Sequence, residues 1–182
     1  MKVKEAFTKI DKLHEYVALA IVDAKDYQAT NLEFVKTFVK KKVPGVYVTL
    51  SKPYETLVNI FKKKGINPKM VIFIDAVSKT AGGPTKKDNC LFIGSPENLS
   101  DLAIAMDQGV KALEKEKFVF FDSLSVLLLY NDPTSVAKFI HFLASKMRVW
   151  KVKGIIVSLK RKEDKNLINE ILQFCDLMLN IK

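Results

Sequence analysis

Short apolar runs alternate along this chain with longer segments in which apolar residues recur every three or four positions. A continuous apolar run rich in β-branched and aromatic residues is typical of a strand covered on both faces, as in a parallel sheet. Apolar residues at every third or fourth position are typical of a helix that faces a core. The predicted strands are residues 15–22, 46–50, 70–74, 90–93, 118–121, 152–159 and 176–181.

Predicted helices connect most of these strands. Thr30-Asn31-Leu32-Glu33 has the pattern of a capping box, so we expect the helix after the first strand to begin with Thr30 as its N-cap. Pro53 and Pro133 suit the first turns of two later helices. The polar segment 78–89 contains Gly and Pro and is predicted to be a long loop. The alternation predicts an α/β fold, a three-layer αβα sandwich around a doubly wound, mostly parallel sheet.

The length of the chain favours one domain over residues 1–182. Residues 1–14 are predicted to form an N-terminal helix, because Phe7, Ile10 and His14 fall roughly on one face. No apolar run approaches the ~20 residues of a membrane helix, so no membrane partner is expected. Two cysteines are too few to staple a domain of this size, which favours a cytoplasmic location.

The chain carries 30 Lys and Arg against 20 Asp and Glu, for a formal net charge of +10. Only Arg148 and Arg161 are arginines, whereas arginine is the residue preferred for gripping phosphate. Abundant Lys with Glu is also the usual surface of a heat-adapted protein. A nucleic-acid partner is therefore weakly supported, and its binding would be non-specific and salt-sensitive. The lysine clusters are residues 40–42, 62–64, 86–87 and 160–162.

Polar residues stand directly after most of the predicted strands. Ligands of doubly wound sheets bind beyond the carboxyl ends of the strands, and hard carboxylate oxygens suit Mg²⁺. Asp23, Asp75 and Asp122 are therefore candidate Mg²⁺ ligands, although an Asp at a strand end also commonly caps a turn or helix. The full set of strand-end residues is Asp23, Asp26, Ser51, Lys52, Asp75, Asp122, Ser123 and Lys160.

The order of elements over roughly residues 12–182 resembles that of the RecA-like ATPases and, within them, the archaeal KaiC-like proteins. The most specific segment is Lys117-Phe118-Val119-Phe120-Phe121-Asp122-Ser123-Leu124-Ser125, which looks like a Walker B strand with its Asp-Ser ending. The resemblance implies that Asp122 helps to hold Mg²⁺. If a nucleotide binds, it also implies that Thr30, Asp122 and Ser123 contact Mg-ATP.

The phosphate-binding loop of that family is not recognisable here. The motif G-x-x-x-x-G-K-[ST] should fall on residues 23–30, where only Thr30 matches. Asp23 and Gln28 replace the two glycines whose backbone N–H groups close around phosphates, and Ala29 replaces the lysine. A carboxylate near a phosphate is repelled by roughly 1 kcal/mol at the dielectric of water and by several near a protein surface.

A second departure lies after the second strand, where the resemblance implies an acid that polarises the attacking water. This chain has Thr49-Leu50-Ser51-Lys52, and a lysine does not accept the proton at neutral pH. We therefore expect no catalytic residues and no bound cofactor. The chain is predicted to be a non-hydrolysing pseudo-ATPase that acts as a regulatory or scaffold protein, through a protein partner or as a homo-oligomer. Trp150 and residues 126–130 are candidates for the self-association surface.

Two alternatives remain open. The first half of the chain also resembles a response-regulator receiver domain, which implies that Asp75 accepts a phosphoryl group and that Asp23 holds Mg²⁺. In that interpretation Ser123 and Lys160 contact the phosphoryl oxygens, and Mg²⁺ and Lys neutralise the transferred charge. The receiver resemblance must treat residues 84–116 as an insertion. The other alternative is an active ATPase that binds nucleotide through an atypical phosphate loop.

Overall fold

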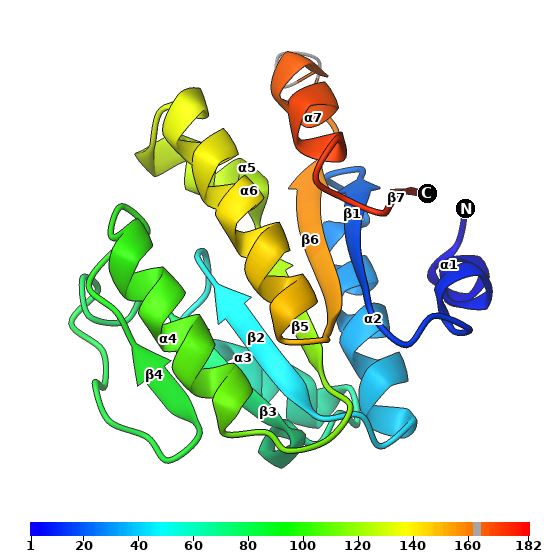
Figure 1. Cartoon of the computed structure of the whole chain (residues 1–182). Helices are drawn as coiled ribbons and strands as arrows, with labels where there is room; N and C mark the ends of the chain where they lie inside the picture. The colour runs from blue at the N-terminus through cyan, green and yellow to red at the C-terminus, as the bar shows by residue number, and fades with distance from the viewer. Residues whose placement is uncertain (162–164) are drawn as a thin grey trace.

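Within residues 1–161 and 165–182, seven parallel strands form one sheet in the order β4-β3-β2-β5-β6-β1-β7 (Figure 1). The computed structural model describes residues 1–161 and 165–182. Each predicted strand is present, within a few residues of its expected bounds. The strands are β1 (Tyr16–Val22), β2 (Gly45–Thr49), β3 (Val71–Asp75), β4 (Cys90–Phe92), β5 (Phe118–Asp122), β6 (Lys153–Leu159) and β7 (Leu177–Ile181).

Helices cover both faces of this sheet and make a three-layer sandwich (Figure 1). One face is covered by α1 (Val3–Ile10), α2 (Tyr27–Lys40) and α3 (Tyr54–Lys63). The other is covered by α4 (Leu99–Lys111), α5 (Leu124–Tyr130), α6 (Pro133–Val149) and α7 (Lys165–Leu172), and a short 3₁₀ helix spans Pro68–Met70. The predicted α/β class with a doubly wound parallel sheet is confirmed. Among the described residues, no helix is both long and apolar enough to cross a lipid bilayer.

The two cores explain why the strands carry almost no polar residues. Along β5, Phe118 and Phe120 face the core under α1, α2 and α3, whereas Val119 and Phe121 face the core on the other side. Successive side chains of a strand point to opposite faces, so a strand buried on both faces must be apolar throughout. Phe120 stacks on Tyr47 of β2, with ring centroids 5.1 Å apart. This burial fixes the carboxyl end of β5 deep in the protein.

Two predicted helix boundaries were wrong. The helix α2 begins at Tyr27, so Thr30 lies within the helix and is not its N-cap. The chain turns sharply before it, because the Asp26 N–H donates to the Asp23 carbonyl at 3.0 Å. The Asp26 carbonyl then accepts the first helical hydrogen bond, from the N–H of Thr30. At the N-terminus α1 ends at Ile10, and His14 lies exposed beyond it.

Candidate functional site

Three carboxylates predicted as Mg²⁺ ligands lie on alternate strands of the sheet. In register, Thr49 of β2 pairs with Asp75 on one side and with Asp122 on the other. The strand β6 separates β5 from β1, after which Asp23 follows. Since neighbouring strands are ~4.8 Å apart, about 19 Å separates β3 from β1. Among the described residues, no group of three or more His, Cys, Asp or Glu side chains could hold a metal ion.

Asp122 is the most unusual of these groups. The residue is 3% exposed, and its Oδ2 accepts a hydrogen bond of 2.5 Å from the hydroxyl of Tyr47. Its Oδ1 is buried with no hydrogen-bond partner among the described residues. Burial disfavours the charged form and raises the pKa of Asp122 to about 7. The carboxyl group therefore releases its proton only around neutral pH.

Side chains from α2 close over this carboxyl group. The Tyr27 hydroxyl and Asn31 Oδ1 are also buried without a partner among the described residues, and these two residues are one helical turn apart. Burial raises the pKa of Tyr47, and an interaction with the Asn31 side chain partly offsets the rise. Asp122, Tyr27, Asn31, Tyr47 and Lys52 all line one cavity of about 10 Å³. We call these five residues the Asp122 cluster.

The size of this cavity decides what it can hold. About 10–15 Å³ is the room that one water molecule needs, and such a water is held when polar partners surround it. The three unpartnered oxygen atoms of the Asp122 cluster are partners of that kind. Small-ligand sites generally need about 300 Å³ or more. The cavity therefore has room for a water molecule and not for a nucleotide.

The segment that should form a phosphate loop is shut. Only the turn at residues 23–26 separates β1 from α2, and residues 27–30 are already helical. Thr30 lines a separate cavity of about 430 Å³, between α2, α1 and the end of β7. The structure therefore does not bring Thr30 to Asp122, as joint contact with Mg-ATP would require.

The two serines after β5, Ser123 and Ser125, accept hydrogen bonds from backbone N–H groups. Ser123 is fully buried and is the N-cap of α5, where its Oγ accepts from the Val126 N–H at 3.4 Å. The Asp122–Ser123 peptide bond is cis. Ser125 Oγ accepts from the Leu159 N–H at 2.8 Å and so ties α5 to the end of β6. Ser123 thus follows Asp122 directly but already has a partner of its own.

Asp75 is as buried as Asp122, but both of its oxygens have partners. Its Oδ1 accepts from the N–H groups of Val77 and Ser78 at 2.7 and 2.8 Å. Its Oδ2 accepts from the Tyr54 N–H at 2.7 Å and from the Ser78 hydroxyl at 2.5 Å. Asp75 therefore joins the first turn of α3 to the turn after β3. A carboxylate with both oxygens engaged in this way is poorly placed to attack a phosphoryl group.

The receiver arrangement is not favoured by these positions. Asp23 and Asp75 stand four strands apart, and Asp75 is fully buried. Lys160 lies near Asp23, with 4.0 Å between Lys160 Nζ and Asp23 Oδ1, and is far from Asp75 in the strand order. The phosphoacceptor, metal-binding and phosphoryl-binding residues of that interpretation are thus not brought to one point.

Tyr27, Asn31 and Tyr47 were not among the predicted site residues. Tyr47 carried a usable signal, because a hydroxyl inside a strand buried on both faces needs a hydrogen-bond partner. Tyr27 and Asn31 carried a weaker one, since their spacing places them on the same helix face only if the helix begins before Thr30. The mistaken capping box concealed that spacing.

One predicted self-association residue is already engaged within the chain. The Trp150 Nε1 donates to Asp107 Oδ1 at 3.0 Å, and Lys146 Nζ lies 5.3 Å from the Trp150 ring centre. Trp150 therefore fastens α6 to α4. Residues 126–130 are only partly available for contact with another chain. Leu127 is buried, whereas Leu129 and Tyr130 are exposed.

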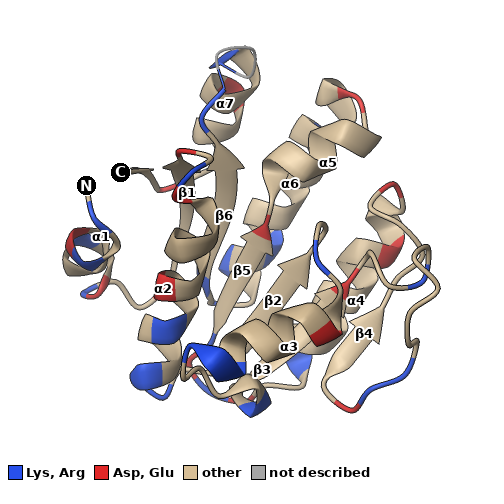
Figure 2. Cartoon of the chain, turned by 180° about the vertical axis from the view of Figure 1, so that it is seen from behind, with Lys and Arg blue, Asp and Glu red and all other residues tan. Residues whose placement is uncertain are grey.

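Lysines gather at the C-terminal ends of α2 and α3 (Figure 2). Asp122 is the last residue of β5 and so lies at the opposite end of the strands. Lys36 Nζ donates to the Lys64 carbonyl at 2.8 Å, which brings clusters 40–42 and 62–64 to the same end of the molecule. Cations favour helix C-termini, so this placement has a structural reason of its own. A nucleic-acid partner stays a prediction.

Residues 48–181 match a family of unknown function, DUF7504. The chain belongs to this family. The match begins near the end of β2 and includes Asp75 and Asp122, whereas α1, β1 and α2 precede it. The match therefore includes β3, β4, β5 and β6 and the helices between them. No curated protein matches the chain.

Two solved structures from Pyrococcus horikoshii share the fold. One is the uncharacterized protein PH0321 in complex with an unknown peptide, with a TM-score of 0.72 and 15% identity over 97% of this chain and 82% of that chain. The other is the KaiC-like protein PH0186 from strain OT3, with a TM-score of 0.67 and 15% identity over 92% and 73% of the two chains. The second likeness confirms the KaiC-like fold expected from the order of elements over roughly residues 12–182. At this identity the likeness concerns the fold alone.

Proposed function

We propose that this protein is a non-hydrolysing relative of the KaiC-like ATPases that acts as a regulatory or scaffold protein by binding a protein or peptide chain. The observation that carries the proposal is the closure of Tyr27 and Asn31 over Asp122. They leave a cavity of about 10 Å³ at the position where the family resemblance would place Mg²⁺ and phosphate.

Electrostatics supports the loss of hydrolysis. Mg²⁺ binds ionised carboxylates, whereas burial raises the pKa of Asp122 to about 7 and keeps a large share of it protonated in neutral solution. If Mg²⁺ were bound, Asp122 is the residue that would hold it, and the ion would neutralise phosphate charge. Among the described residues that line this cavity, Asp122 is the only Asp, Glu or His, so the lining offers no second acidic or imidazole group to serve as a general base.

Exposed apolar side chains support association with another chain. Leu129 and Tyr130 at the end of α5 are 69% and 47% exposed, and Phe142 and Val149 of α6 are also exposed. Leu129 and Tyr130 are neighbours in the chain, and large apolar side chains that lie together on a surface are typical of contact sites. PH0321, which shares the fold, was crystallised with an unknown peptide. Peptide or protein binding is therefore the activity that we propose for this chain.

A nucleotide assay tests the proposal. Bound ligand at about a hundredfold excess over Kd raises the unfolding free energy by about 2.7 kcal/mol, which a melting curve detects easily. We expect Mg-ATP and Mg-ADP to leave the Tm unchanged and phosphate release to stay at background. The wild-type protein, Asp122→Asn and the exposed-site control Asp101→Asn should all show no nucleotide-dependent change in Tm and no phosphate release above background. Phosphate release that Asp122→Asn abolishes and Asp101→Asn preserves would overturn the proposal.

A further inference from the structure

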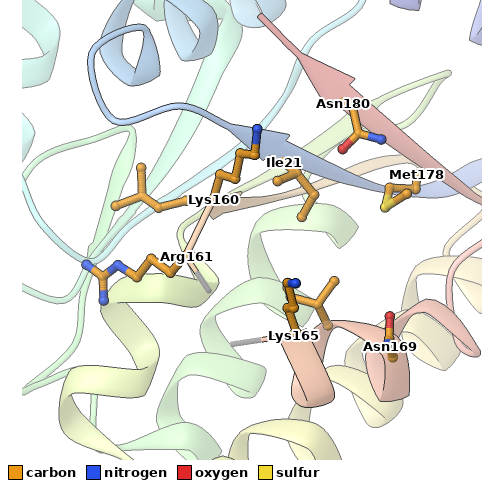
Figure 3. Close-up of a pocket in the computed structure, with 9 residues that line it drawn as sticks. Ile21, Lys160, Arg161, Lys165, Asn169, Met178 and Asn180 are labelled. Atoms are coloured by element: carbon orange, nitrogen blue, oxygen red, sulfur yellow. The ribbon is translucent and has the colours of Figure 1, made fainter. Parts of the chain in front are cut away.

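A groove opens between α7 and the carboxyl ends of β1, β6 and β7, away from the Asp122 cluster (Figure 3). Its volume of about 320 Å³ lies at the lower end of the range for ligand sites. Apolar side chains from all four elements line it. They are Ile21, Leu159, Ile168 and Met178.

Three cationic side chains are among the residues that line this groove. Lys160 and Arg161 lie at one end of the groove, and Lys165 rises from α7 toward Ile21 (Figure 3). No aspartate or glutamate is among the described residues that line it. Asp23 lies beside Lys160, but the distance of 4.0 Å between its Oδ1 and Lys160 Nζ is at the limit of an ion pair. The groove therefore favours a ligand that is both apolar and anionic.

Amide side chains supply the remaining polar groups of the groove. Asn169 of α7 and Asn180 of β7 are exposed, and neither side chain hydrogen-bonds to another described residue. Each amide can donate and accept, as the backbone of an extended peptide requires. Met178 is 43% exposed on the sheet surface, and its flexible thioether can adapt to different aliphatic side chains.

We propose that this groove binds an acidic peptide segment, with an aliphatic side chain on its apolar surface and neighbouring carboxylates beside Lys160, Arg161 and Lys165. The inference rests on the proposed function and assigns the peptide to one surface. Nucleic acid fits the groove less well, because single strands are held mainly by aromatic rings that stack on bases, and no aromatic residue is among the described lining residues.

Fluorescence anisotropy with three synthetic peptides tests the inference on the full chain. The probe alternates Leu and Glu, a second peptide replaces each Glu by Lys, and a third replaces each Leu by Ser. We expect measurable binding of the Leu/Glu probe and not of the other two peptides. The affinity for the probe should fall as salt is added, because the charges are exposed. Equal binding of the Ser-containing peptide would show that the apolar surface is not used and would overturn the inference.

Matched variants locate the binding. The double variant Lys160→Glu/Arg161→Glu should weaken probe binding by about tenfold. Lys62→Glu/Lys63→Glu makes the same change of charge in exposed lysines of α3 and should bind as the wild type does. Met178→Ser should weaken binding several-fold, whereas Ile104→Ser, at an exposed position on α4, should not. All four changes are at or near the surface, and melting curves verify that each variant folds.

The outcomes separate this inference from the proposed function. If the two charge-reversed variants lose affinity equally, binding follows net charge and the groove is not the site. If a single-stranded oligonucleotide displaces the probe at a lower concentration than the unlabelled peptide does, the groove is a nucleic-acid site and the inference fails. In both cases the nucleotide assay still decides whether the protein hydrolyses ATP. ATP turnover would overturn the proposed function and leave the measured peptide site in place.

Discussion

Asp75 and Asp122 end the two strands that flank β2, and both pair in register with Thr49. Asp75 accepts four hydrogen bonds, three of them from backbone N–H groups. Asp122 accepts one, from the Tyr47 hydroxyl, and its other oxygen has no partner among the described residues. The two carboxyl groups are almost equally buried, so burial alone does not distinguish their roles. The two carboxyl groups differ instead in the number of hydrogen-bond donors around each.

The donors around Asp75 come from the chain that it organises. Val77 and Ser78 lie two and three residues after it, and Tyr54 begins α3. The polar residues around Asp122 are distant from it in the chain. Tyr47 lies on β2, and Tyr27 and Asn31 lie on α2. A polar group that a fold needs is generally surrounded by partners, whereas a buried group without them is costly and needs another explanation. We interpret Asp75 as part of the framework, whereas the structure supplies no such role for the unpartnered oxygen of Asp122 among the described residues.

The largest effect is expected from Asp75→Ala. The change removes the acceptor of the N–H groups of Tyr54, Val77 and Ser78, of which those of Tyr54 and Ser78 are buried, and each hydrogen bond to a charged group contributes substantially to stability. We expect the unfolding free energy to fall by about 4 kcal/mol in urea titrations. Asp101→Ala, at an exposed carboxylate on α4, should change it by less than about 0.5 kcal/mol. Similar small losses from both would contradict a framework role for Asp75.

Asp122→Asn should have a smaller effect that depends on pH. Burial raises the pKa of Asp122 to about 7, so between about pH 4 and pH 7 the folded protein keeps a proton that the unfolded chain releases. Wild-type stability is therefore fully retained below pH 4 and falls as the pH rises to 7, by about 3 kcal/mol from this group. The Asn variant does not titrate, so its stability relative to wild type should rise over this window.

The measurement is a urea titration of both proteins at several pH values from 4 to 8, with Asp101→Asn as the control for a carboxylate that is lost at the surface. In the Asp122→Asn variant the new amide oxygen can still accept from the Tyr47 hydroxyl, so the change should not disturb the local packing. Parallel pH profiles of the wild-type protein and Asp122→Asn would mean that the carboxyl group titrates as if it were in water, and the comparison with Asp75 would lose its basis.

The apolar pattern was enough to predict the sheet. Strands buried on both faces must be apolar throughout, and the short continuous apolar runs at residues 15–22 and 118–121 fit that requirement. Pattern alone did not predict which strands are neighbours. Asp75 and Asp122 look alike in the sequence, since each is the last residue of a buried strand.

The site was harder to predict because its contacts join distant parts of the chain. Tyr47 and Asp122 are 75 positions apart, and their contact depends on β2 and β5 pairing in one register. The start of α2 was misplaced because the pattern from Thr30 to Glu33 fits a capping box, yet the turn at residues 23–26 starts the helix earlier. The N-cap is therefore Asp26, four residues before Thr30, and it is Tyr27 and Asn31, not Thr30, that line the cavity at Asp122.

The smallest effect is expected from Tyr47→Phe, which removes the single donor to Asp122 and keeps the ring that stacks on Phe120. When Asp122 is protonated, the loss should be about 1 kcal/mol, and it should grow to about 2 kcal/mol above pH 7, because a hydrogen bond to a carboxylate is stronger than one to a neutral acid. The pKa of Asp122 should rise further in this variant.

Tyr54→Phe is the matched control. The Tyr54 hydroxyl donates at 2.6 Å to the neutral amide oxygen of Asn89, so its loss should lower the unfolding free energy by the same amount at every pH. A Tyr47→Phe cost that is flat between pH 5 and pH 8, like that of Tyr54→Phe, would mean that the hydroxyl does not bond to an ionisable oxygen, and Asp122 would then have no donor at all among the described residues.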